Sequence, residues 1–145
     1  MPLDPAISDA NHAATERLRS FAARLSDVEF QRPVGEHWTV SMVFVHLAFW
    51  DRRCLAMLDR IEHAGRDAEV DIYLVVNDLS LPIWAAVPPH DATRIAIESA
   101  EALDARIDGY PDELAAAVLD THPRWIRRSP HRNEHLDEAE AALGH

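Results

Sequence analysis

The sequence contains a single cysteine, Cys54, and only four glycines among its 145 residues. One thiol cannot form an intramolecular disulfide, so a disulfide framework is excluded and a reducing, cytoplasmic location is expected. The small number of glycines argues against a β-sandwich, because its many turns need glycine. Nine prolines stand beside the four glycines. This balance favours long helices joined by connections that proline marks.

Long hydrophobic runs are also lacking. The longest, residues 42–50, contains a histidine and is far shorter than the roughly 20 apolar residues that span a bilayer. The N-terminal segment MPLDPAISDA has neither a basic region nor an apolar core, so no secretory signal is expected. We therefore expect no membrane partner.

Positive charge is scarce: the sequence has 14 basic and 25 acidic residues, which gives a formal net charge of −11. Nucleic acid is therefore not expected as a partner, since binding phosphates needs a concentrated basic surface. The densest basic run is RWIRRSPHR, residues 124–132. The favoured interpretation is a solvated loop and helix start. The alternative is a site for an anionic substrate.

Apolar residues recur at steps of three and four over residues 7–28, which predicts an amphipathic helix. Residues 26–38 contain Pro33 and Gly35 and are predicted to form a loop. Thr39 is the predicted N-cap of a second helix that extends to about residue 64. The first half of this helix is apolar nearly all round, so it should be the most buried.

The second half of the chain is predicted to contain two further main helices. Residues 71–87 are expected to form a helical connection with a break near Pro82. A helix at about 91–109 follows, then a short helical turn at 111–119 and a loop at 120–128. The last helix is expected to begin with Ser129 as N-cap and Pro130 as first residue, and to end at Gly144.

The pattern predicts an all-α fold: one domain over residues 1–145, built as an antiparallel four-helix bundle. A helical connection joins its second and third helices. No segment alternates with period two for long enough to predict a sheet. A homodimer is compatible with this fold, although no exposed apolar stripe requires one.

Three histidines form the main candidate site. His46 lies in the most apolar stretch, MVFVHLAFW. A buried imidazole needs a hydrogen-bond partner or a metal, and a core histidine bonded to a carbonyl is one interpretation. His131 and His135 are four residues apart, so a helix places them on one face. Facing helices of a bundle could join all three as ligands with an open position, as in catalytic zinc sites. Cys54 is expected to be a small core residue instead.

The sequence resembles the DinB-like superfamily. GEHWTVSMVFVHLAFWDRR (35–53) is similar to its second-helix signature, and HRNEHLDEAEAAL (131–143) to its final His-x-x-x-His helix. VVNDLSLPIWAAVPPHDATRIAIESAEAL (75–103) resembles the third-helix region of the branch that contains mycothiol-dependent maleylpyruvate isomerases. The resemblance implies a four-helix bundle whose divalent metal is held by His46, His131 and His135.

The resemblance also implies an activity on a small molecule. Such proteins include thiol-dependent S-transferases and isomerases, which use mycothiol, bacillithiol or glutathione, and hydrolases. We expect a transferase of the mycothiol type or a related hydrolase, because 145 residues leave no room for the second domain of the isomerases. The alternatives are a non-catalytic binding protein and a purely structural bundle. Zinc is the first expectation, with nickel or iron as alternatives, since imidazole suits several metals.

Further candidates are weighed against ordinary structural roles. Glu138 shares the face of the two last-helix histidines and is the predicted acid or base, unless it is simply exposed; Glu134 and Asp137 lie nearby. Asp51 could orient a ligand, although a surface position is favoured. Asn77 could bind substrate or turn a helix. The aromatic residues could wall a pocket or pack in the core: Trp38, Trp50 and Trp84.

Overall fold

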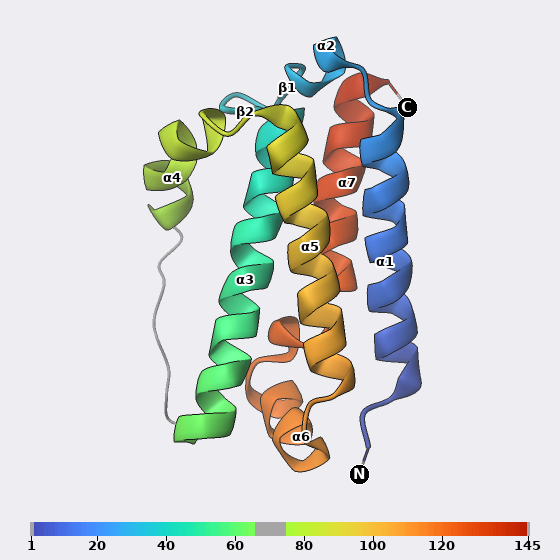
Figure 1. Ribbon diagram of the computed structural model, residues 1–145, viewed down its shortest axis with the longest axis vertical. Coiled ribbons are helices and arrows are strands. Elements are labelled where there is room, and N and C mark those ends of the chain that lie inside the picture. The colour runs from blue at the N-terminus through green and yellow to red at the C-terminus, as the bar shows by residue number, and fades with distance from the viewer. Residues whose placement is uncertain (1, 66–74, 145) are drawn as a thin grey trace.

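The computed structural model describes residues 2–65 and 75–144, and for residues 75–79 the backbone alone. Four long helices lie side by side in Figure 1: α1 (Pro5–Arg24), α3 (Val40–Ala64), α5 (Pro89–Asp108) and α7 (Ser129–Leu143). The shorter elements are α2 (Asp27–Phe30), β1 (Pro33–Val34), β2 (Trp38–Thr39), α4 (Val75–Ala85), α6 (Asp112–Thr121) and the 3₁₀ turn η1 (Pro123–Trp125). The prediction of an all-α protein is confirmed. The prediction that no sheet forms is wrong only for the two-residue strands β1 and β2 among the described residues, which pair in an antiparallel arrangement.

The long helices run in two directions (Figure 1). Helices α1 and α7 run from the end that carries α6 towards the end that carries α2, and α3 and α5 run the opposite way. The expectation that successive helices alternate is therefore wrong for α3 and α5, which pack against each other in parallel. Residues 65–88 separate the two helices, and α5 begins at the end of the structure where α3 also begins.

The first predicted helix is divided in two. Helix α1 ends at Arg24, and Leu25 adopts an extended conformation. Ser26 then caps the single turn of α2 by accepting a hydrogen bond from the backbone N–H of Glu29. Val28, expected on the apolar seam, is consequently 74% exposed. Thr39 is the N-cap of α3 and accepts from the N–H of Met42, which confirms the predicted start of that helix.

Two other boundaries differ from expectation. Pro82 lies inside α4 rather than at a break, so that helix continues with one backbone hydrogen bond fewer. The part of the predicted connection at residues 71–74 lies outside the described residues. Helix α7 has Arg128, not Ser129, at its N-cap position, and the Arg128 side chain does not cap it. Instead, Asn11 of α1 accepts from the N–H groups of both residues through its Oδ1 atom.

The core consists of two apolar clusters with a polar layer between them. One cluster gathers around Phe21, Phe30 and Phe44, and the other around Leu58 and Leu103. The buried polar residues of the layer come from all four long helices and from the residue that precedes α7: Asn11, Thr15, Asp51, Ser99, Asp104, Arg128 and Arg132. Burial of such groups is costly unless each is bonded, so their partners determine how the helices fit together.

Candidate metal centre

The structure brings His46, His131 and His135 together between α3 and α7. Each offers a ring nitrogen, and these atoms all lie within 4.8 Å of one another. The Nε2 atoms of His46 and His135 are 3.0 Å apart. Two imidazole nitrogens on one tetrahedral zinc, each at 2.0–2.1 Å from the ion, would be separated by about 3.3 Å. The His46–His135 pair therefore stands close to the spacing that a single metal ion requires, and a ring nitrogen of His131 lies within 4.8 Å of both.

The chemistry of this donor set fits a divalent ion. His46 is 3% exposed, and its Nδ1 atom has no hydrogen-bond partner among the described residues. The backbone carbonyl that could have explained a buried histidine is thus not observed. Burial, helped by repulsion from neighbouring cationic groups, lowers the pKa of His46 to about 3 and that of His131 to about 2. Both rings are therefore neutral at pH 7, which is the form that binds metals.

Arg128 fixes the position of His131. Its Nη2 atom donates to Nδ1 of His131 at 3.1 Å, because a guanidinium can only donate. Asp51 holds Arg128 through a bond from Nε at 2.9 Å. The expected surface position of Asp51 is wrong, since this carboxylate is 1% exposed and both of its oxygens accept from arginines. Asp51 therefore reaches the histidines only through Arg128, as a positioning residue.

Arg132 connects this arrangement to the polar layer. Its guanidinium donates to Asp51 through Nε and to Asp104 of α5 through Nη1, at 3.0 and 2.8 Å. The same Nη1 atom reaches the hydroxyl of Thr15 on α1. The interpretation of residues 124–132 as a solvated loop and helix start is therefore wrong for Arg128 and Arg132, which are both buried. Three other helices, α1, α3 and α5, thus fix the orientation of the histidine-bearing helix α7.

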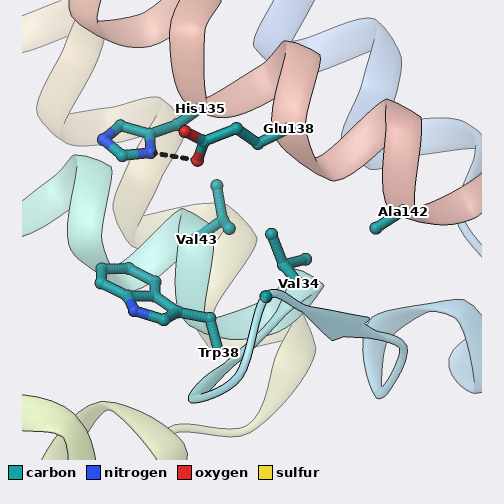
Figure 2. A pocket seen from close by; sticks show the side chains of 7 residues that line it. Val34, Trp38, Val43, His135, Glu138 and Ala142 are labelled. Carbon is teal, nitrogen blue, oxygen red and sulfur yellow. Dashed lines mark hydrogen bonds and ion pairs between the residues drawn. The ribbon is translucent and has the colours of Figure 1, made fainter.

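Glu138 accepts a hydrogen bond from Nδ1 of His135 at 3.0 Å, one turn further along α7. Figure 2 shows this contact at the edge of a pocket of about 600 Å³, above the side chains of Val43 and Trp38. A carboxylate at Nδ1 leaves Nε2 of His135 available on the side of His46. Of the other predicted acids, Glu134 lines the neighbouring pocket, and Asp137 forms an ion pair with Arg17 instead.

The aromatic candidates surround His46. Its ring contacts those of Trp38, Trp84 and Trp50, at centroid distances of 4.6, 5.4 and 6.2 Å. Trp38 and Trp50 line a second pocket of about 370 Å³ that opens onto all three histidines, whereas Trp84 belongs to the apolar core. The Asn77 side chain lies outside the described part of the structure. Cys54 is buried as expected, yet it also lines this pocket.

Sequence reasoning missed Arg128, Arg132 and Asn11, which orient the histidines of α7. The available signal was the spacing of these arginines. Arg128 and Arg132 are four residues apart, like the two histidines of α7, and each lies three residues before one of those histidines. That spacing places the two arginines on one helix face beside the histidines. It did not show whether that face was buried.

The depressed pKa values predict that the metal-free protein loses stability in acid. The unfolded chain binds protons at His46 and His131 near pH 6.5, whereas the folded chain does not until far lower pH. The free energy of unfolding should therefore fall as pH drops below 6.5, by up to about 1.4 kcal/mol per pH unit for each ring.

Urea unfolding of the metal-free protein at pH 7.5, 6 and 5 measures this dependence. In His46→Leu, the slope between pH 6 and 5 should be smaller than that of the unsubstituted protein by about 1 kcal/mol per pH unit. Equal slopes in the two proteins would mean that His46 is not held neutral in the folded state.

Fold and site together define an all-α protein with a cluster of three histidines that could hold a metal ion. The comparison with family models gives a narrower assignment, since the model described as mycothiol maleylpyruvate isomerase N-terminal domain matches residues 11–133. The chain belongs to this family of the DinB-like superfamily. No curated protein matched the chain, and no solved structure did. Among the described helices, none combines the length and hydropathy needed to cross a bilayer.

Proposed function

We propose that residues 1–145 form one DinB-like four-helix bundle that acts as a divalent-metal-dependent enzyme on a small molecule. The reaction is a thiol-dependent transfer of the mycothiol type or a related hydrolysis. The observation that carries the proposal is the convergence of His46, His131 and His135 at a pocket of about 370 Å³. Family membership supports the choice of a thiol, because the family is described by mycothiol chemistry.

The number of ligands favours an active site over a structural one. Three protein nitrogens leave one position of a tetrahedral ion open, whereas structural zinc sites are closed by four ligands that usually include cysteine. A divalent ion held here would lower the pKa of a thiol or a water bound at that position. Cys54 does not complete the set, because burial raises the pKa of its thiol and a neutral thiol is a poor ligand.

The chain's own residues orient and enclose the reacting groups. Glu138 holds the ring of His135 through Nδ1, and its side chain is half exposed, so it can also exchange protons with solvent. Trp38 and Trp50 form apolar walls that restrict water around His46. Arg128 holds His131 in place. We assign the acid–base role to Glu138, and a positioning role to Asp51 because it acts through Arg128.

A thiol-consumption assay tests this function. Zinc-loaded protein is incubated with mycothiol, bacillithiol or glutathione and a panel of electrophilic alkyl and aryl halides and epoxides, and loss of free thiol is followed. We expect metal-dependent consumption with at least one thiol, reduced more than tenfold in Glu138→Gln. Glu101→Gln, an exposed acid on α5, is the matched control and should retain full activity. Saturable binding of an electrophile without consumption of any thiol would favour a non-catalytic binding protein and overturn the proposed transfer reaction.

A further inference from the structure

The pocket beside the histidines carries positive charge, in contrast to the chain as a whole. Among the described residues, three arginines line it, Arg53, Arg124 and Arg128, together with one acidic residue, Glu134. The full sequence has 25 acidic and 14 basic residues. A local excess of cations inside a low-dielectric cleft attracts anions more strongly than the same charges would on an open surface.

The three arginines are not equivalent. The guanidinium of Arg128 is committed to the protein, because it donates to Asp51, His131 and the backbone carbonyl of Arg124. Arg124 is exposed, and its own side chain forms no hydrogen bond or ion pair with any residue that the structure describes. Arg124 is therefore a cation at the pocket wall whose donors are available to a ligand.

Arg53 lies among aromatic rings of the same pocket. Its Cζ atom is 5.8 Å from the ring centroid of Trp50 and 5.3 Å from that of Trp125. The ring of His122 stacks on that of Trp125, with a centroid distance of 4.0 Å and an interplanar angle of 17°. Such contacts restrict both the arginine and the indole rings. The pocket thus combines flat apolar walls with cationic groups, as ligand sites commonly do.

We propose that this pocket binds a small carboxylate, with Arg124 holding the carboxylate group, Arg53 adding positive charge beside it, and Trp50 and Trp125 contacting a planar apolar body. The opposite end of such a ligand lies towards His46, His131 and His135. This inference rests on the proposed function and names the class of its substrate. Guanidinium groups suit a carboxylate because both are planar and can form paired hydrogen bonds. It also gives a role to the exposed part of the basic run at residues 124–132.

The test compares phenylacetate with its uncharged analogue phenylacetamide, using the full chain without metal and with zinc. Binding is measured by calorimetry and by quenching of tryptophan fluorescence. The metal-free protein should bind phenylacetate about tenfold more tightly than phenylacetamide, since one charge-assisted hydrogen bond accounts for about that factor. Arg124→Gln should abolish this preference and leave the affinity for phenylacetamide unchanged.

Arg127→Gln is the matched control, because Arg127 is exposed in the same segment and does not line the pocket. It should keep the preference for the carboxylate. If Arg124→Gln and Arg127→Gln lost this preference equally, the general positive charge of the segment, and not Arg124, would select the carboxylate. That result would overturn the proposal. A preference that requires zinc and survives Arg124→Gln would overturn it too, while leaving the metal site intact. Absence of metal binding would instead refute the proposed function, and the metal-free arm tests the carboxylate site independently.

Discussion

Replacement of His46 by alanine is expected to weaken zinc binding by more than a hundredfold. Structural zinc sites with four ligands bind with apparent free energies of about 10–16 kcal/mol, so one ligand accounts for about 3 kcal/mol. His46 is also the one histidine of the cluster on α3, whereas the other two belong to α7. Without it, only a two-histidine site on one helix remains. Competition with a chromophoric chelator at pH 7.5 measures the change in the dissociation constant.

Two further variants make this result interpretable. His46 is buried among aromatic rings, so His46→Ala also leaves a cavity. His135→Ala removes a ligand with a partly exposed side chain and should weaken binding to a similar extent. His90→Ala changes an exposed histidine that is not part of the cluster and should leave zinc affinity unchanged. If the ligand variants bound zinc as tightly as the His90 variant, the three histidines would not be the metal site.

The second large effect is expected on stability. Arg132→Met should lower the free energy of unfolding by about 3–5 kcal/mol, because it leaves charges uncompensated in the interior. The Arg132 side chain is fully buried, and it bonds Asp51 and Asp104, both 1% exposed. Methionine has a comparable length and fills much of the space, so the loss reports mainly on the missing charge. Urea unfolding of the metal-free protein at pH 7.5 gives the value.

Arg94→Met is the control for this experiment. Arg94 forms exposed ion pairs on the surface of α5 with Asp91 and Glu98, and such pairs contribute well below 1 kcal/mol. The double variant Asp51→Asn/Arg132→Met should lose less stability than the sum of its two single variants, because both substitutions disrupt the same bonds. A loss below 1 kcal/mol in Arg132→Met, similar to the control, would contradict the role assigned to the polar layer.

Features set by local sequence were predicted well. The three-and-four spacing of apolar residues identified the first helix, although a local cap at Ser26 ended it early. Thr39 followed by an apolar stretch located the start of α3 and the burial of His46. Such signals depend on neighbours within one or two helical turns, so they can be recognised without knowledge of the fold.

Features set by distant partners were not predicted. An arginine in a basic run is ordinarily solvated, and Arg132 is buried only because Asp51 and Asp104 reach it from two other helices. The start of α7 depends likewise on Asn11 of α1, which lies 117 residues from Arg128 in the sequence. The parallel direction of α5 relative to α3 is a property of the whole fold, which the periodicity of each helix does not encode.

The central claim is that three histidines hold one metal ion beside an open position. X-ray absorption spectroscopy at the zinc edge, combined with a crystal structure of the zinc-loaded protein, tests it most directly. We expect one zinc per chain with nitrogens of His46, His131 and His135 at about 2.0–2.1 Å and one non-protein ligand facing the pocket. Zinc bound at other residues, or coordination that omits His46, would contradict the account.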